Sequence, residues 1–122
     1  MLRTIMLVAA GGACGAVARY GMVSVSSKLG LGFPWGTALT NIVGCFAIGF
    51  VLGVYAEAEW FVDFGRSFLV VGILGAFTTF SAFSMETLIL IDANQWGMAS
   101  AYVLASVAVC LLAAWAGQSV AA

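Results

Sequence analysis

The stretch with the clearest potential for chemistry runs from Gly72 to Glu86, inside a long apolar segment. It contains one more glycine, Gly75, then two adjacent threonines, Thr78 and Thr79, and two serines further on. If the segment crosses a bilayer, an ordinary lipid-facing helix turn does not suit these residues, because lipid offers no hydrogen bonds. Gly75 loosens the helix, the threonine hydroxyls bond to local backbone groups, and released carbonyls need a side chain, water or a cation. The stretch therefore predicts a broken helix, near Gly75–Thr79, that lines a polar site.

Two other apolar segments carry polar side chains at intervals of four residues, which places each set on one face of a helix. The sets are Thr37, Asn41 and Cys45, and Tyr102, Ser106 and Cys110. Asn41 has two N–H donors and is costly to bury without partners, so it forms either an interhelical hydrogen bond or a ligand contact. With Thr79, Ser81 and Ser84, the two faces supply many neutral donors and few charges. That mixture suits a small anion or a file of water better than a multivalent ion.

Three phenylalanines, Phe77, Phe80 and Phe83, recur at intervals of three residues. Such a pattern is typical of packing residues. An alternative is that the positive edges of the rings border an anion. Glu86 follows Phe83 by three residues and so lies on the same side of a helix, where it either caps a polar vestibule or carries a proton.

Glycines predict where the helices touch. Gly11 and Gly15 form one face of small residues, and Gly49 and Gly53 form another, so that backbones approach closely. Arg19 continues the first face at the next interval of four. We therefore expect Arg19 to point into the bundle, although an arginine near a span end can also extend to the membrane surface.

The amino-acid composition indicates whether the fold is surrounded by water or by lipid. Of 122 residues, 64% are hydrophobic and 7% are charged, whereas a soluble domain has about 25% charged residues. The chain is therefore expected to be an integral membrane protein. The net charge of −1 gives no nucleic-acid footprint, and histidine is absent. The three cysteines occur without a CxxC motif, and we interpret them as small apolar fillers and not as a metal site.

Hydropathy predicts one all-α domain over residues 1–122 with four transmembrane helices, each meeting the requirement of roughly 20 apolar residues. Short polar connections separate the spans, and residues 56–66 hold most of the acids. Tryptophans lie near the span ends, where indole favours the boundary between water and hydrocarbon. The predicted spans are Ile5–Val25, Trp35–Tyr55, Phe68–Ile91 and Trp96–Trp115.

The basic residues are distributed almost evenly between the two sides of the membrane. Arg3 and Arg66 belong to one side and Lys28 to the other, with Arg19 as a further candidate beside Lys28, so the count of basic residues barely favours either direction. The chain has either one weakly determined topology or two, with oppositely inserted copies forming an antiparallel homodimer. Four short helices enclose little volume, so a polar pathway is expected to need a second subunit.

Taken together, the motifs resemble those of the Fluc/CrcB fluoride channels, in order and over nearly the whole chain. They are Gly11-Gly12 with Gly15-Ala16 and Arg19-Tyr20, Gly36-Thr37 with Asn41 and Gly44, and Gly72 with Gly75 and Thr78-Thr79-Phe80-Ser81-Ala82-Phe83. The resemblance implies a dual-topology homodimer in a cell (inner) membrane, with two antiparallel pores through which cytoplasmic F⁻ leaves passively. It also implies a structural Na⁺ at the dimer axis and no enzymatic activity.

The same resemblance implies roles for single residues. Phe80 and Phe83 match the aromatic box of the pore, with Asn41 and Ser81 beside it. The carbonyls of Gly75 and Thr78 match the Na⁺ ligands. The remaining pore or vestibule positions are Thr37, Thr79, Tyr102, Ser106, Glu86 and Arg19.

Two positions depart from the family pattern. Ala82 replaces a threonine between the two box phenylalanines, and Cys110 stands where a serine is expected, which leaves a weaker donor. The main alternative function is a proton-coupled efflux transporter of the small multidrug type. Such carriers have a glutamate within the first span, whereas here Glu86 is the only candidate for coupling. A non-transporting membrane assembly protein would fit the glycines but not the polar faces.

Overall fold

The computed structural model describes residues 1–121, so the last residue of the predicted domain, Ala122, lies outside the described part. Within residues 1–121, four helical segments are long and apolar enough to cross a membrane, as predicted. The third of these, Phe61–Asp92, is made of three pieces, and the first and fourth extend beyond their predicted bounds. The elements are α1 (Leu2–Lys28), α2 (Trp35–Tyr55), η1 (Phe61–Leu74), α3 (Gly75–Phe77), α4 (Phe80–Asp92) and α5 (Trp96–Ala121).

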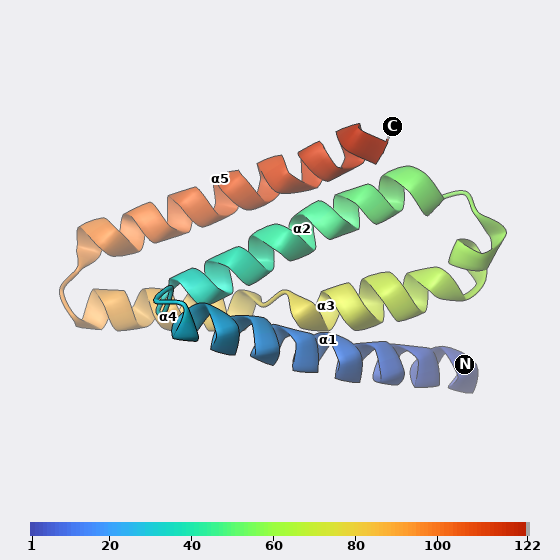
Figure 1. Ribbon diagram of the computed structural model, residues 1–122, viewed down its shortest axis with the longest axis horizontal. Coiled ribbons are helices and arrows are strands. Elements are labelled where there is room, and N and C mark those ends of the chain that lie inside the picture. The colour runs from blue at the N-terminus through green and yellow to red at the C-terminus, as the bar shows by residue number, and fades with distance from the viewer. Residues whose placement is uncertain (122) are drawn as a thin grey trace.

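The helices lie roughly along one axis (Figure 1). α2 packs most extensively against α5, and α1 packs against η1 and α3, while α4 contacts α5. The amino terminus and the end of α5 lie at the same end of the molecule as the α2–η1 connection. The chain therefore crosses the bundle an even number of times.

The third span begins earlier than predicted, at Phe61 instead of Phe68, and its first part is a π-helix, Phe61–Leu74. The charges of Asp63 and Arg66 suggested a loop, but both are accommodated at the helix end. The Asp63 carboxylate accepts two hydrogen bonds of 3.2 Å from Arg3, and the Arg66 guanidinium lies 5.7 Å from the centre of the Phe61 ring. Phe61 itself is fully buried and anchors this start.

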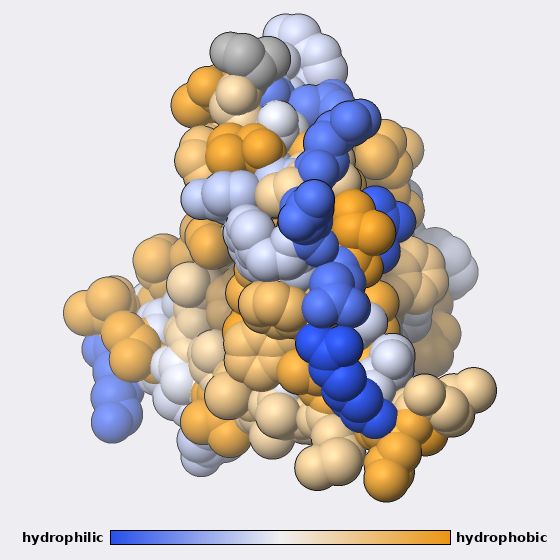
Figure 2. All heavy atoms as spheres, turned by 90° about the vertical axis from the view of Figure 1, so that its right-hand side faces the viewer, coloured by the Kyte–Doolittle hydropathy of each residue, from blue (hydrophilic) through white to orange (hydrophobic). Residues whose placement is uncertain are grey.

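Figure 2 views the end of the molecule that carries the amino terminus and the end of α5, and it shows a band of hydrophilic residues between apolar surfaces. Several charged residues near this end are exposed. They are Arg3, Glu57, Glu59, Asp63 and Arg66. By contrast, many large apolar side chains along the helices are also exposed. An apolar outer surface with charges at the end is the arrangement that a bilayer requires.

The predicted glycine faces are confirmed as helix contacts. A Cβ placed on Gly15 would overlap the backbone of Ile73, and one on Gly11 would lie 3.0 Å from the Gly72 Cα. On the other side of the bundle, a Cβ on Gly49 would lie 2.9 Å from the carbonyl carbon of Ala114 in α5. The absence of a side chain at these positions therefore sets the distance between helix backbones.

We expect Gly15→Ala to destabilise the protein by about 1–3 kcal/mol, the usual cost of overpacking a filled interior. The new methyl group would meet the Ile73 carbonyl carbon at 2.9 Å, and backbone cannot move aside as a flexible side chain can. Gly12→Ala is the matched control on the same helix, because a Cβ there meets nothing within 4 Å. Thermal unfolding in detergent measures both, and equal melting temperatures for the two variants would contradict the packing assigned to Gly15.

Candidate functional site

The third span is interrupted at Thr78 and Thr79. α3 ends at Phe77, Thr78 has ψ 155° and Thr79 has φ −149°, both extended, and α4 begins at Phe80. The break lies in the predicted region, but the expectation that Gly75 loosens the helix is wrong, since Gly75 keeps helical angles of φ −63° and ψ −36°. The β-branched threonines, which are less favoured in helices, form the break instead.

Asn41 of α2 bonds both backbone groups of Thr79. Its Nδ2 donates to the Thr79 carbonyl at 3.1 Å, and its Oδ1 accepts from the Thr79 N–H at 2.7 Å. The two bonds replace those that a continuous helix would have made, so the interruption is held open by one side chain. An amide has a second N–H donor, and Asn41 also lines the cavity described below.

Several carbonyls before the break lose their usual helical donors. The Thr79 N–H, which an α-helix would pair with the Gly75 carbonyl, goes to Asn41, and the Ala82 N–H goes to Thr79 Oγ1 at 3.1 Å instead of to the Thr78 carbonyl. The Ala76 carbonyl accepts from Arg19 Nε at 3.2 Å. Arg19 thus points into the bundle, as predicted, and its charge lies at a helix C-terminus, where cations are favoured.

The other side of the break is the N-terminus of α4. Thr79 caps this helix through its bond with the Ala82 N–H, and its Oγ1 lies 3.3 Å from Ser81 Oγ. The first N–H groups of a helix have no partners within the helix, and the helix dipole makes this end positive. The break therefore offers donors suited to an anion.

A cavity of about 330 Å³ lies between the break and the α2–α5 pair. It brings together members of both polar faces that the sequence predicted, since Asn41 and Cys45 come from α2 and Ser106 and Cys110 from α5. The break and α4 supply the rest of the polar and aromatic lining. These residues are Thr78, Thr79, Phe80 and Phe83.

The aromatic residues form a row beside this cavity. The ring centres of Phe80 and Phe83 are 5.4 Å apart, and those of Phe83 and Tyr102 are 5.1 Å apart. Phe83 is only 8% exposed, whereas Phe80 is 77% exposed. Phe77 does not continue the row, because the helix ends after it and its ring packs toward Gly44. The regular interval of three residues is therefore interrupted by the break.

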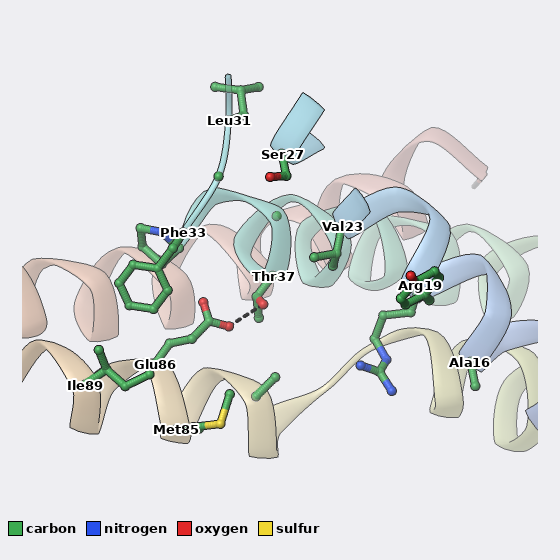
Figure 3. Close-up of a pocket in the computed structure, with 15 residues that line it drawn as sticks. Ala16, Arg19, Val23, Ser27, Leu31, Phe33, Thr37, Met85, Glu86 and Ile89 are labelled. Carbon is green, nitrogen blue, oxygen red and sulfur yellow. Dashed lines mark hydrogen bonds between the residues drawn. The ribbon is translucent and has the colours of Figure 1, made fainter. Parts of the chain in front are cut away.

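Glu86 is buried in a second polar group on the same side of α4 as Phe83. Its carboxylate accepts hydrogen bonds from Thr37 Oγ1 and, at 3.4 Å, from the Tyr102 hydroxyl. Figure 3 shows Glu86 from α4 and Arg19 from α1 at one cavity, with Thr37 bonded to Glu86. This cavity has a volume of about 460 Å³. Its two charges of opposite sign come from different helices.

The predicted site residues thus lie at two cavities, which Tyr102 connects. Asn41, Thr79, Phe80, Phe83 and Ser106 surround the smaller cavity, and Ser81 is exposed at the start of α4. Arg19, Thr37 and Glu86 surround the larger one. Tyr102 joins them, because its ring packs on Phe83 and its hydroxyl bonds Glu86.

Sequence reasoning missed two features of the site. It did not identify the Ala76 carbonyl as the partner of Arg19, for which no sequence signal exists. It placed Cys45 and Cys110 on the polar faces but treated them as fillers, although both line the smaller cavity. The signal available in the sequence was the interval of four residues, which places Cys45 on the same helix face as Asn41 and Cys110 on the same face as Ser106.

The fold and the site define a multi-pass membrane protein whose third span is broken beside a cavity of neutral donors and aromatic rings. Residues 6–118 match the family described as CrcB-like protein, Camphor Resistance (CrcB). The chain belongs to this family.

Curated relatives cover nearly the same length. A protein of Opitutus terrae is 43% identical over 116 residues, covering 93% of this chain and 88% of its own. One of Geobacter sulfurreducens is 43% identical, with 95% and 94% covered, and one of Alteromonas mediterranea is 46% identical, with 88% and 86% covered. Each of the three is named fluoride-specific ion channel FluC.

Proposed function

We propose that this protein is a fluoride channel and not an enzyme. The observation that carries the proposal is the cavity at the helix break, where the Asn41 amide, the N-terminus of α4 and the rings of Phe80 and Phe83 meet. These groups are neutral donors and positive ring edges, which can replace part of the water around a small anion. The relatives described above are named fluoride-specific ion channel FluC, and F⁻ is a small anion of the kind that these groups suit.

The neutral donors of the cavity lining, together with its lack of charged side chains, support passive conduction of a small anion. A narrow path that strips water favours a small anion over larger ones, and its donors disfavour cations. Because the lining of the cavity holds no charged side chain, the ion meets no deep electrostatic well and can leave again. Arg19 adds positive potential nearby, where its side chain is bonded to the Ala76 carbonyl and not placed in the cavity.

The physiological role follows from acid chemistry. HF crosses membranes as a neutral molecule, dissociates in a less acidic cytoplasm and is trapped there as F⁻. A passive channel in the cell (inner) membrane would drain this pool and relieve fluoride toxicity. No energy source is required for such efflux, because the trapped anion moves down its own gradient.

We expect liposomes containing the purified protein to release F⁻ rapidly and Cl⁻ slowly. The larger, more weakly hydrated Cl⁻ does not fit a path narrow enough to strip water from F⁻. Ion-selective electrodes measure both effluxes on the same preparation after a potassium ionophore is added. Protein-free liposomes are the control, and equal release of the two anions would contradict fluoride selectivity.

The functional unit that we propose is an antiparallel homodimer with two pores. Support comes from the surface of the single chain, where Phe80, Ser81 and Gly75 are exposed although they lie in the middle of a span. Polar groups and box rings at this depth need a protein partner and not lipid. The basic residues also permit both insertions, since Arg3 lies near one end and Lys28 ends α1 at the other.

Dual topology predicts partial labelling from one side. In a background without native cysteines, Glu57→Cys places a thiol in the exposed α2–η1 connection. An impermeant maleimide applied to intact cells should modify about half of the population if copies insert equally both ways. Permeabilised cells give the total. Labelling of all copies or of none would end the dual-topology proposal.

The dimer also suggests a structural Na⁺. The Gly75 and Thr78 carbonyls fit this ion in that their helical donors are diverted to Asn41 and Thr79. Carbonyl oxygen is the ligand type that hard cations take, and no set of three or more His, Cys, Asp or Glu residues converges within residues 1–121. Two such carbonyl pairs, one from each subunit, would surround the ion, and an experimental structure of the dimer would reveal its density.

The efflux transporter is the weaker proposal. Its coupling acid would have to be Glu86, since α1 contains no acidic residue. Glu86 is already bonded to Thr37 and Tyr102. Family membership also favours the channel, as the relatives are named channels.

A further inference from the structure

Two thiols that the proposed conduction does not require lie at the same cavity, one on α2 and one on α5. Cys45 and Cys110 both line the cavity of about 330 Å³, and each lies four residues before a close approach of α2 and α5, where a Cβ on Gly49 would be 2.9 Å from the carbonyl carbon of Ala114. Both cysteines are free and half-buried. The third cysteine, Cys14, is exposed on α1 and is not part of this cavity.

The ligand set determines which metal the pair could hold. Thiolate sulfur selects soft cations, and the two thiols come from helices that pack side by side and line one cavity. A tetrahedral Zn²⁺ site needs four ligands, whereas no group of three or more His, Cys, Asp or Glu residues forms in the part of the chain described. The site therefore suits a soft cation that is satisfied by two sulfur ligands in line.

Charge narrows the choice further. Each thiol releases its proton to water as its bond to the metal forms, so two thiolates carry two negative charges. A divalent cation gives a neutral complex, whereas a monovalent cation leaves a net negative charge within the membrane, which is costly. Two-coordinate divalent binding is therefore favoured at this depth.

We propose that Cys45 and Cys110 form a two-thiolate site for a soft divalent cation of the Hg²⁺ class, and that the bound ion obstructs the cavity. This interpretation replaces that of the two cysteines as mere fillers. Binding depends only on the geometry of the pair. Obstruction additionally rests on the proposed function, because it requires fluoride to pass beside Asn41 and Ser106, which line the same cavity.

Binding is tested with HgCl₂ on purified protein carrying Cys14→Ala, so that only the pair remains. Titration in the presence of a competing monothiol, followed by the near-ultraviolet absorption of mercury thiolates, should show one Hg²⁺ per chain. Cys45→Ser or Cys110→Ser in that background should weaken binding roughly a hundredfold or more, because the second sulfur acts at high effective concentration. Equal affinity in either single-cysteine protein would overturn the site. Alanine replacements serve if a serine variant does not fold.

Obstruction is tested on the same proteins in liposomes. Hg²⁺ should reduce fluoride efflux at least tenfold in the Cys14→Ala protein, relative to its own untreated rate, and a dithiol chelator should restore it. In the presence of Hg²⁺, either serine variant should retain most of the fluoride efflux rate that the same variant shows without Hg²⁺. Tight binding with unchanged efflux would overturn the obstruction. If the untreated protein does not conduct at all, the proposed function fails, while the absorption titration still decides the metal site.

Discussion

Phe80→Ile should slow fluoride efflux roughly twofold to tenfold while leaving the fold intact, taking a ring-edge contact with the anion to be worth about as much as an aromatic pair, about 0.5–1.5 kcal/mol. Isoleucine keeps the apolar character but has no ring quadrupole. Because the Phe80 side chain is 77% exposed in the single chain, its replacement removes little packing. Efflux from liposomes and thermal unfolding in detergent are measured on the same preparation.

Phe83→Ile tests whether the Phe83 ring stabilises the fold by packing, contacts the conducted anion, or does both. Phe83 is 8% exposed and packs on both Phe80 and Tyr102, so this change should lower stability as well as efflux. Phe50→Ile is the matched control, because Phe50 is partly exposed at 37% and does not line the cavity. If folded Phe80→Ile and Phe83→Ile proteins conduct as well as the control, the rings are packing residues and the aromatic path is wrong.

Much of the fold could be predicted because apolar length is a strong signal. All four spans were expected, and Trp35–Tyr55 has the predicted bounds. The start of the third span was missed because Asp63 and Arg66 lowered local hydropathy, and their partners, Arg3 and the Phe61 ring, are distant or ambiguous in sequence. The π-helix was also missed, since the same residues fit an α-helical pattern.

The site shows a different limit of sequence reasoning. Intervals of four correctly grouped Asn41 with Cys45 and Ser106 with Cys110, because helical periodicity is local. Partners across helices depend on how the helices pack, so the bond from Arg19 to the Ala76 carbonyl and the placement of Cys45 and Cys110 at one cavity required the structure. Gly75 was a misleading signal: its freedom suggested a break that Thr78 and Thr79 form instead.

Asn41→Asp should have the largest effect on conduction, because it changes both the helix break and the charge beside the path. An aspartate can still accept from the Thr79 N–H but, when ionised, cannot donate to the Thr79 carbonyl. A negative charge about 4 Å from F⁻ costs about 4 kcal/mol at an effective dielectric constant of about 20, so efflux should fall roughly a hundredfold or more. The efflux assay is run at neutral to alkaline pH, where a carboxyl group is ordinarily ionised.

Asn41→Leu distinguishes a pore residue from a structural one. Leucine has a similar size and no charge, but it leaves both backbone groups of Thr79 without the side-chain partner, at about 1–3 kcal/mol for each group. We therefore expect Asn41→Leu to lower the melting temperature more than Asn41→Asp, and Asn41→Asp to lower efflux more per folded protein. The opposite order would mean that Asn41 only holds the break open. In that case the anion takes its donors from the N-terminus of α4, and the Asn41 amide does not face the ion.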